Sequence, residues 1–213
     1  MSKKIFWIVG IIAACIIGII VLTDASQEKA EIDYANQPFM GDENAPVEII
    51  EFGDYKCPHC GEFNNSMVPF IKEEFVDTGK AKFYFMNYAF IAVDSSMAAL
   101  FAETVYEELG NEMFWEFHDL LFANQATADG LENFMDEDFL TTILSKIASE
   151  EELKQVGEAF SKNQADALLD KDMEMAKNLG VNSTPAIFIG GKKFEGMTMD
   201  DFADMVEEAA NDQ

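Results

Sequence analysis

The chain of 213 residues contains no arginine and only three cysteines. Its 14 lysines face 40 aspartates and glutamates, so the formal net charge is -26. A surface this acidic repels phosphate backbones and anionic headgroups, which excludes a nucleic-acid-binding role. Two of the three cysteines are separated by only two residues, so a secreted scaffold held by several disulfides is excluded as well.

Apolar residues, by contrast, are plentiful. Hydrophobic residues make up 49% of the chain and include 19 phenylalanines, enough for one sizeable core. The acidic excess indicates solubility. A cluster such as Asp136, Glu137 and Asp138 could also bind calcium through oxygen ligands, but no segment has the spaced Asp/Asn loop with its glycine. Calcium is therefore a hypothesis that no motif supports.

The amino terminus predicts export. Residues 5–22 are uncharged, and as a helix they would span about 27 Å, close to the thickness of a bilayer core. Two lysines precede the run and acidic residues follow it, which places the folded domain outside the cell membrane. The run exceeds a typical cleaved signal core, so residues 1–22 are expected to be a single-pass anchor. Cleavage after Ala25 and lipidation of Cys15 remain alternatives, and both also export the domain.

The segment after the anchor begins as an acidic linker, residues 23–37, and then changes to strand and helix patterns. Residues 46–52 form a β-branched apolar run that predicts a buried central strand ending at Gly53. Apolar residues at helical spacing follow from residue 63 to 75. Residues 81–91 predict a second strand, parallel to the first across the intervening helix.

The remainder is helical until a final hairpin. Residues 94–178 show helical periodicity, with a capping box opening at Ser149 and breaks expected at Gly110 and Gly130. Residues 186–189 and 193–195 flank Gly190, Gly191 and Lys192 as a hairpin, and Thr198 with Asp201 opens a last helix.

This order predicts an α/β, thioredoxin-like fold with a helical insertion. We expect the thioredoxin-like domain to comprise residues 38–93 and 170–213, and the insertion to comprise residues 94–169.

The chemistry is expected at Cys57-Pro58-His59-Cys60, at the junction of the first strand and helix. Residues three apart in the first helical turn have Cα atoms about 5.5 Å apart, so the two sulfurs can form a disulfide without rearrangement. Pro58 suits the first helical position, where its missing N–H costs nothing. Free amides, the positive helix end and His59 would stabilise a Cys57 thiolate.

A Cys57 pKa lowered to about 4 would stabilise the reduced form at pH 7 by about 4 kcal/mol, or about 90 mV. Because the reduced form is the one stabilised, this effect favours donating the disulfide to a substrate. Cys60, one turn deeper, is expected to be more buried and to act as the resolving thiol.

Other interpretations of these residues are weaker. A zinc site needs four ligands, and only His59 and His118 remain as nitrogen donors. A purely structural bridge would close too short a loop to stabilise much. His118 lies with Phe114, Trp115 and Phe117 at helical spacing, which indicates that these side chains pack in the hydrophobic core of the insertion. Glu51 alone could be an ordinary half-exposed strand carboxylate, and spacing alone favours a trans peptide before Pro185.

Three groups of residues together resemble the DsbA family of disulfide oxidoreductases over roughly residues 38 to 210. They are Glu51-Phe52 ahead of Cys57-Pro58-His59-Cys60, Phe114-Trp115-Glu116-Phe117-His118, and Gly180-Val181 ahead of Thr184-Pro185. The resemblance implies that Cys57 is the attacking sulfur and that Glu51 assists proton movement near the buried cysteine. It also implies a cis peptide before Pro185, with Thr184 and Pro185 at the substrate-binding edge. Some Gram-positive members, which this tethered acidic chain resembles most, bind calcium.

We therefore expect an extracytoplasmic enzyme that introduces disulfides into reduced or unfolded exported polypeptides, with a substrate held transiently on Cys57. No cofactor is expected beyond the Cys57–Cys60 disulfide. The resemblance implies a DsbB-like, quinone-linked membrane protein as reoxidant. Because Thr184 precedes the proline in isomerases and reductases too, a reductase or isomerase remains an alternative. A peptide-binding chaperone with incidental cysteines is the second alternative.

Overall fold

The computed structural model describes residues 29–125 and 134–212, and its folded unit begins at Ile32. The predicted anchor, its cleavage and lipidation alternatives and most of the linker lie outside the described residues. Among the residues that are described, no helix is long and apolar enough to cross a membrane. Ile32 and Gln37 are buried, so ordered packing starts before residue 38.

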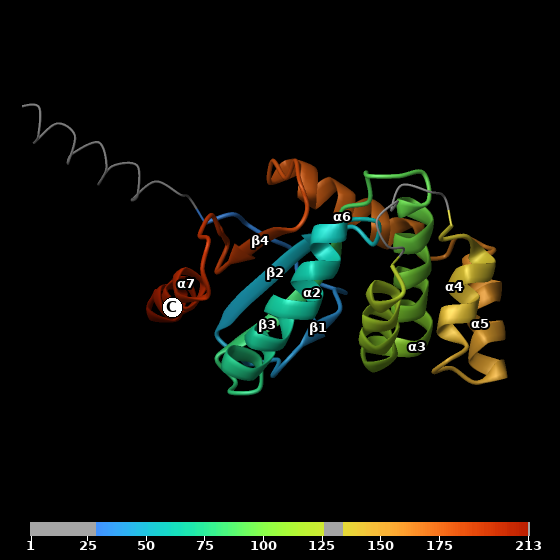
Figure 1. Ribbon diagram of the computed structural model, residues 1–213, viewed down its shortest axis with the longest axis horizontal. Coiled ribbons are helices and arrows are strands. Elements are labelled where there is room, and N and C mark those ends of the chain that lie inside the picture. The colour runs from blue at the N-terminus through green and yellow to red at the C-terminus, as the bar shows by residue number, and fades with distance from the viewer. Residues whose placement is uncertain (1–28, 126–133, 213) are drawn as a thin grey trace, which may run out of the picture. The chain divides into compact units, whose positions relative to one another are not determined.

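A five-stranded sheet forms the centre of the folded unit, in the order β1-β3-β2-β4-β5 (Figure 1). The strands are β1 (Phe39–Met40), β2 (Val47–Gly53), β3 (Ala81–Asn87), β4 (Ala186–Ile189) and β5 (Lys192–Lys193). Strands β2 and β3 pair in parallel, as predicted, and the other pairs are antiparallel. The apolar run of β2 is central because it is covered on both faces.

Strand β3 is shorter than predicted and ends at Asn87 instead of residue 91. Beyond it, the backbone N–H groups of Phe90 and Ile91 donate to Asp54 Oδ2, at 2.9 and 3.0 Å. These amides bind a side chain of the loop after β2, so they cannot continue the ladder. The aromatic pattern could not reveal this competition.

Helix α2 (Pro58–Ile71) starts directly after the β2 loop and crosses the front of the sheet in Figure 1. It continues into a π-helical turn, η1 (Lys72–Val76). The last helix, α7 (Met199–Asn211), packs against β2 and β4. Its Phe202 ring lies 6.0 Å from that of Phe75 in η1, so both helices cover the same face.

The helical insertion is present between β3 and β4. It contains α3 (Ser95–Ala123), α4 (Glu137–Leu144) and α5 (Glu150–Phe160), which pack on one another. Helix α6 (Asp166–Asn178) packs against α3 and β3, and the chain then continues into β4. The predicted boundary at residue 169 falls inside α6, so the division into 94–169 and 170–213 stays a prediction.

Most local signals match the structure. Gly110 breaks α3 with φ +85°, whereas Gly130 lies outside the described residues. Both capping boxes, at Ser149 and Thr198, are formed. The hairpin differs: Gly190 and Gly191 alone make the turn, with φ +55° and +81°, and Lys192 is already in β5. A two-residue turn with positive φ at both positions fits strand twist better than the predicted three-residue loop.

Candidate active site

The two sulfurs lie where β2 passes into α2. Cys57 is the N-cap residue of α2, with φ -79° and ψ 115°, and Pro58 is the first helical residue, as predicted. Cys57 is 3% exposed and Cys60 is completely buried, and the pair is in its dithiol form. An incoming thiol can therefore approach Cys57 more readily than Cys60.

A distant segment completes the surroundings of Cys57. Its Sγ lies 3.3 Å from the carbonyl oxygen of Thr184, 127 residues away in the sequence. The Thr184-Pro185 peptide is cis, as the family resemblance implies and against the expectation from spacing alone. Because β4 begins at Ala186, the first residue of this inner strand follows directly after the contact with the reactive sulfur.

The pKa of the Cys57 thiol is lowered to about 6. The Cys60 thiol contributes most as a hydrogen-bond partner, and the Thr184 side chain and the backbone N–H groups of Cys60 and His59 also stabilise the thiolate, whereas burial opposes it. The direction agrees with the sequence prediction, but the pKa stays above the assumed value of about 4. A Cys57 pKa that lies one unit below a pH of 7 stabilises the reduced form by only about 1.4 kcal/mol. This corresponds to about 30 mV in the reduction potential of the pair.

A titration of the reduced protein can check this property. Thiolate absorbance at 240 nm is expected to rise with a midpoint near pH 6, because the lowered pKa favours the charged sulfur above that pH. Alkylation by iodoacetamide should accordingly slow as the pH falls through 6. A midpoint near pH 9, as for an ordinary cysteine, would contradict the assignment.

His59 does not hold the sulfur with its ring. The imidazole Nδ1 lies 3.1 Å from Glu62 Oε2, and both side chains are exposed. Glu62 raises the pKa of His59, and the charge of Cys57 adds to this rise. The backbone N–H of His59 forms a hydrogen bond to the Cys57 thiolate, and the attraction between a protonated ring and the thiolate also favours the charged sulfur.

Glu51 is completely buried in β2, so it is not a half-exposed strand carboxylate. Burial raises its pKa well above the usual range, and the charge of Cys57 raises it further, although the Cys60 thiol offsets part of this effect. Neither carboxyl oxygen has a hydrogen-bond partner within the described part of the chain. Burial likewise raises the pKa of Cys60. Burial therefore favours the protonated form of both groups.

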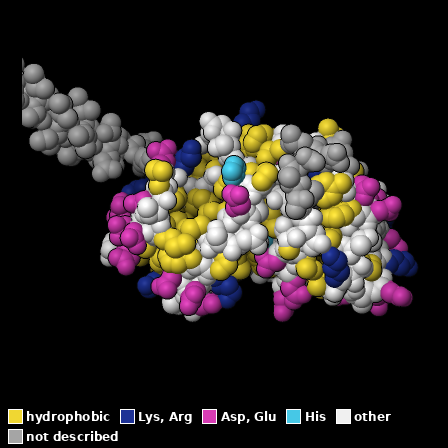
Figure 2. Space-filling model, viewed as in Figure 1, with side chains coloured by type: hydrophobic (Ala, Val, Ile, Leu, Met, Phe, Trp, Pro, Cys, Tyr) yellow, Lys and Arg dark blue, Asp and Glu magenta, His cyan; other side chains and the backbone are white. Residues whose placement is uncertain are grey.

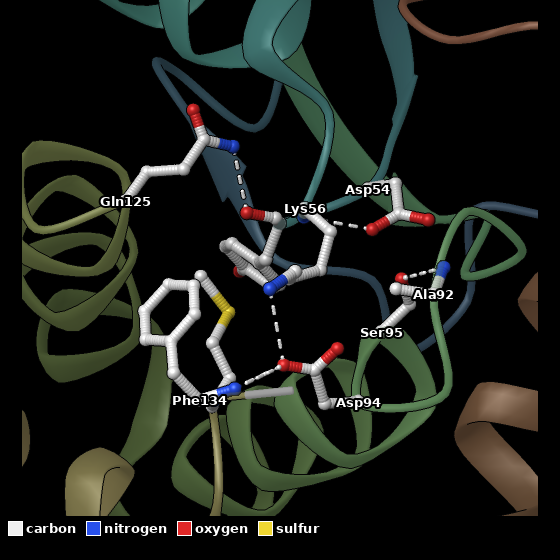
Figure 3. A network of polar contacts seen from close by, with 9 residues as sticks. Asp54, Lys56, Ala92, Asp94, Ser95, Gln125 and Phe134 are labelled. Atoms are coloured by element: carbon white, nitrogen blue, oxygen red, sulfur yellow. Dashed lines mark hydrogen bonds and ion pairs between the residues drawn. The ribbon is translucent and has the colours of Figure 1, made fainter. Parts of the chain in front are cut away.

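The loop before Cys57 is held by residues that the sequence did not single out (Figure 3). Gln125 Nε2 donates to the carbonyl oxygens of Tyr55 and Cys57, at 2.7 and 2.8 Å. The ammonium of Lys56, whose side chain is fully buried, lies 3.1 Å from Asp94 Oδ2. A lysine next to the motif gave no signal of burial, since lysine is normally exposed.

His118, Phe114, Trp115 and Phe117 are buried in the insertion, as predicted. Burial lowers the pKa of His118 to about 3, so its ring is neutral. It lies 3.1 Å from the Tyr55 hydroxyl. Because His59 is exposed on α2 and His118 is in the core, the two imidazoles do not converge on a zinc site, and no cluster of three metal-binding side chains occurs among the described residues.

A buried network of oxygen atoms lies beyond β3. Asp172 accepts from Gln37 Nε2 at 2.6 Å and from the Asn87 N–H at 2.7 Å, and Glu103 accepts from Asn87 Nδ2 at 2.7 Å. Burial raises the pKa of both carboxyls. The amide oxygens of Gln37 and Asn87 are buried without a partner among the described residues.

Two carboxylates and two unpaired amide oxygens form a donor set that suits calcium. The sequence pointed elsewhere, to residues 136–138. There Asp136 caps α4 by accepting from the Phe139 N–H, and all three side chains are exposed. The buried network was missed because its members are far apart in the sequence.

Comparison with known proteins gives consistent relatives. A family model described as thioredoxin matches residues 33–208. Disulfide bond formation protein D of Bacillus subtilis is 33% identical over 73% of this chain and 68% of its own length. The crystal structure of oxidised BdbD from Bacillus subtilis superposes with a TM-score of 0.78 at 29% identity, covering 86% of this chain and 97% of that one. DsbA of Chlamydia trachomatis, at 24% identity, shares the fold with a TM-score of 0.72 over 88% of this chain and 97% of that one.

Proposed function

Because this chain belongs to the thioredoxin family as a DsbA-like thiol-disulfide oxidoreductase, we propose that it works as an oxidase that introduces disulfides into exported proteins. The observation that carries the direction is the asymmetry of the pair. Cys57 lies at a helix N-terminus with a stabilised thiolate, while Cys60 is completely buried behind it. Stabilising the product thiolate favours giving the disulfide away.

In the proposed reaction, a substrate thiolate attacks Cys57 Sγ of the oxidised pair. The Cys57–Cys60 bond breaks, a mixed disulfide forms on Cys57, and Cys60 leaves and takes up a proton. A second substrate thiolate then attacks the substrate sulfur of the mixed disulfide and releases Cys57 as a thiolate. Two electrons pass to the enzyme, and the substrate gains one disulfide.

We assign Glu51 the proton transfer at Cys60. Burial raises the pKa of its carboxyl and so favours the protonated form, and the carboxyl lies close enough to Cys60 for each to influence the pKa of the other. Leaving as a bare thiolate inside the core would be costly, so a nearby acid lowers the barrier.

Replacing Glu51 by glutamine should therefore slow reduction of the disulfide by about 100-fold, because an amide cannot donate this proton. Stopped-flow fluorescence with a cysteine peptide measures the rate. Glu48→Gln is a matched control on the same strand, where Glu48 pairs with Lys82 at 3.2 Å, and it should leave the rate unchanged. Equal rates for Glu51→Gln and the native protein would show that Glu51 does not supply the proton to Cys60.

Thr184 and Pro185 are proposed to bind the substrate backbone on either side of its cysteine. Their support is position: the Thr184 carbonyl touches Cys57 Sγ, and β4 starts directly afterwards. An extended peptide placed there can add hydrogen bonds at the strand end.

The domain is proposed to act outside the cell membrane, tethered by residues 1–22, with a DsbB-like quinone-linked membrane protein as its reoxidant. The support is the charge asymmetry around the apolar run and the likeness to a protein named for disulfide bond formation.

The direction of electron flow can be tested by acid-quenched alkylation in cells. We expect the Cys57–Cys60 pair to be mainly oxidised, whereas a mainly reduced pair would favour a reductase or isomerase. A double Cys57→Ala, Cys60→Ala variant separates the chaperone alternative, because a chaperone would keep its cellular role without either sulfur.

A calcium ion is proposed as a structural partner of the network formed by Gln37, Asn87, Glu103 and Asp172. When bound, it would neutralise the two buried carboxylates and accept the two unpaired amide oxygens as ligands. It has no step in the thiol exchange.

Calorimetry with calcium at pH 7 should show binding with proton release and a rise in Tm. Because the pKa of both carboxyls is raised, affinity should fall as the pH is lowered towards 5 and the carboxyls bind protons. Asp172→Asn should weaken binding, whereas Asp136→Asn in the exposed cluster should not. Absence of heat and of a Tm shift would exclude the site.

A further inference from the structure

An open groove lies between the end of β5 and α7, and it is not used by the proposed chemistry. It encloses about 510 Å³ and is lined by Phe194, Glu195, Gly196, Met197, Asp201, Asp204, Met205 and Glu208. In Figure 2 hydrophobic side chains gather beside a cluster of acidic side chains over α7. The groove's own lining combines the apolar side chains of Phe194, Met197 and Met205 with four acidic side chains.

The groove starts close to the cis peptide. The Phe194 N–H donates to the Ile187 carbonyl at 2.8 Å, and Ile187 lies two residues after Pro185. At about 3.3 Å per strand residue and about 4.8 Å between strands, Phe194 is roughly 8 Å from Pro185. A peptide whose cysteine reacts at Cys57 would reach the groove with a side chain two or three residues away.

The apolar part of the groove is available to a ligand. Phe194 and Met205 are partly buried against the core and form the floor. Met197 is 95% exposed and Met199, at the start of α7, is 46% exposed. Large exposed apolar side chains beside a hollow are typical of a binding surface.

The rim carries uncompensated negative charge. Asp201 is occupied, since it accepts from the Met197 and Thr198 N–H groups, and Glu208 pairs with Lys192 at 2.8 Å. Glu195 and Asp204 make no ion pair among the described residues. A second groove, on α5, has Lys154 and Lys162 among its glutamates, so its charges are mixed.

We propose that the β5–α7 groove selects substrates in which an apolar residue, two or three positions from the reacting cysteine, is flanked by lysine or arginine. The apolar side chain enters the floor, and the cation pairs with Glu195 and Asp204. This inference rests on the proposed oxidase function and names the class of polypeptide that it favours.

The test measures how fast the oxidised protein is reduced by two peptides that differ only in the flanking residue, lysine or glutamate. The native protein should prefer the lysine peptide, and a Glu195→Gln, Asp204→Asn variant should lose about fivefold of that preference at low salt. The matched control, Glu150→Gln with Glu151→Gln on α5, removes the same charge from exposed positions elsewhere and should keep it.

Equal loss in both double variants would mean that net charge alone sets the preference, and an unchanged ratio in the rim variant would also overturn the inference.

Met197→Ser, at an exposed position, should slow both peptides alike by removing apolar contact. Glutathione serves as a small thiol that does not reach the groove. If glutathione reduces the pair but no variant alters peptide preference, only the groove fails; if no thiol reduces it, the proposed function fails and the inference with it.

Discussion

A Cys60→Ala variant is expected to lose all multiple turnover and to accumulate substrates bound covalently to Cys57. Its Cys57 thiolate can still attack a disulfide in an exported protein and form a mixed disulfide. In the native enzyme Cys60 can reverse such an adduct by attacking Cys57 Sγ, which forms the Cys57–Cys60 disulfide and releases the substrate as a thiolate, but alanine offers no such sulfur. Because Cys60 is completely buried, no external thiol can take its place from the same side.

The variant should also react more slowly than the native thiol. The Cys60 thiol is the main cause of the lowered Cys57 pKa, so its loss should raise that pKa and reduce the thiolate fraction at pH 7. Adducts are detected by non-reducing electrophoresis and mass spectrometry in a Cys15→Ala background, which removes the third cysteine. A Cys57→Ala control should show none. Absence of adducts on Cys57 in the trap variant would count against the assigned nucleophile.

Replacing Lys56 by methionine is expected to destabilise the protein by about 3–5 kcal/mol, the cost of leaving a buried charge without its partner. Asp94 Oδ2 receives the Lys56 ammonium at 3.1 Å and the N–H groups of Phe134 and Met135 at 3.0 Å each (Figure 3). The ammonium also lies 4.0 Å from the centre of the Phe134 ring. Methionine keeps the length of the side chain but supplies no charge.

Urea unfolding of the oxidised protein measures this effect. Lys72→Met is the matched control, because it breaks the exposed Lys72–Asp77 pair of 2.6 Å and should cost less than about 1 kcal/mol. A Lys56→Met, Asp94→Asn double variant removes both charges, keeps an acceptor oxygen for the Phe134 and Met135 N–H groups, and should recover part of the stability. If Lys56→Met were no more harmful than Lys72→Met, the buried pair would not hold the loop before Cys57.

Local sequence signals predicted much of the fold. The central strand, the start of α2 at Pro58, both capping boxes and the break at Gly110 depend on residues within a few positions of one another. Two of the errors arose where a distant group intervened. Strand β3 ends early because Asp54 takes the next amides, and the Cys57 pKa stays near 6 because burial opposes the groups that stabilise the thiolate.

The sequence by itself determined the reactive motif, its place between a strand and a helix, and the insertion that follows. These follow from spacing and periodicity along one stretch of chain. Only the tertiary structure decided that Thr184 touches Cys57, that Glu51 is buried, and that Lys56 pairs with Asp94. The physical reason is that burial and pairing join groups far apart in the chain, and they set the charge state of each group through desolvation and partners that no local pattern specifies.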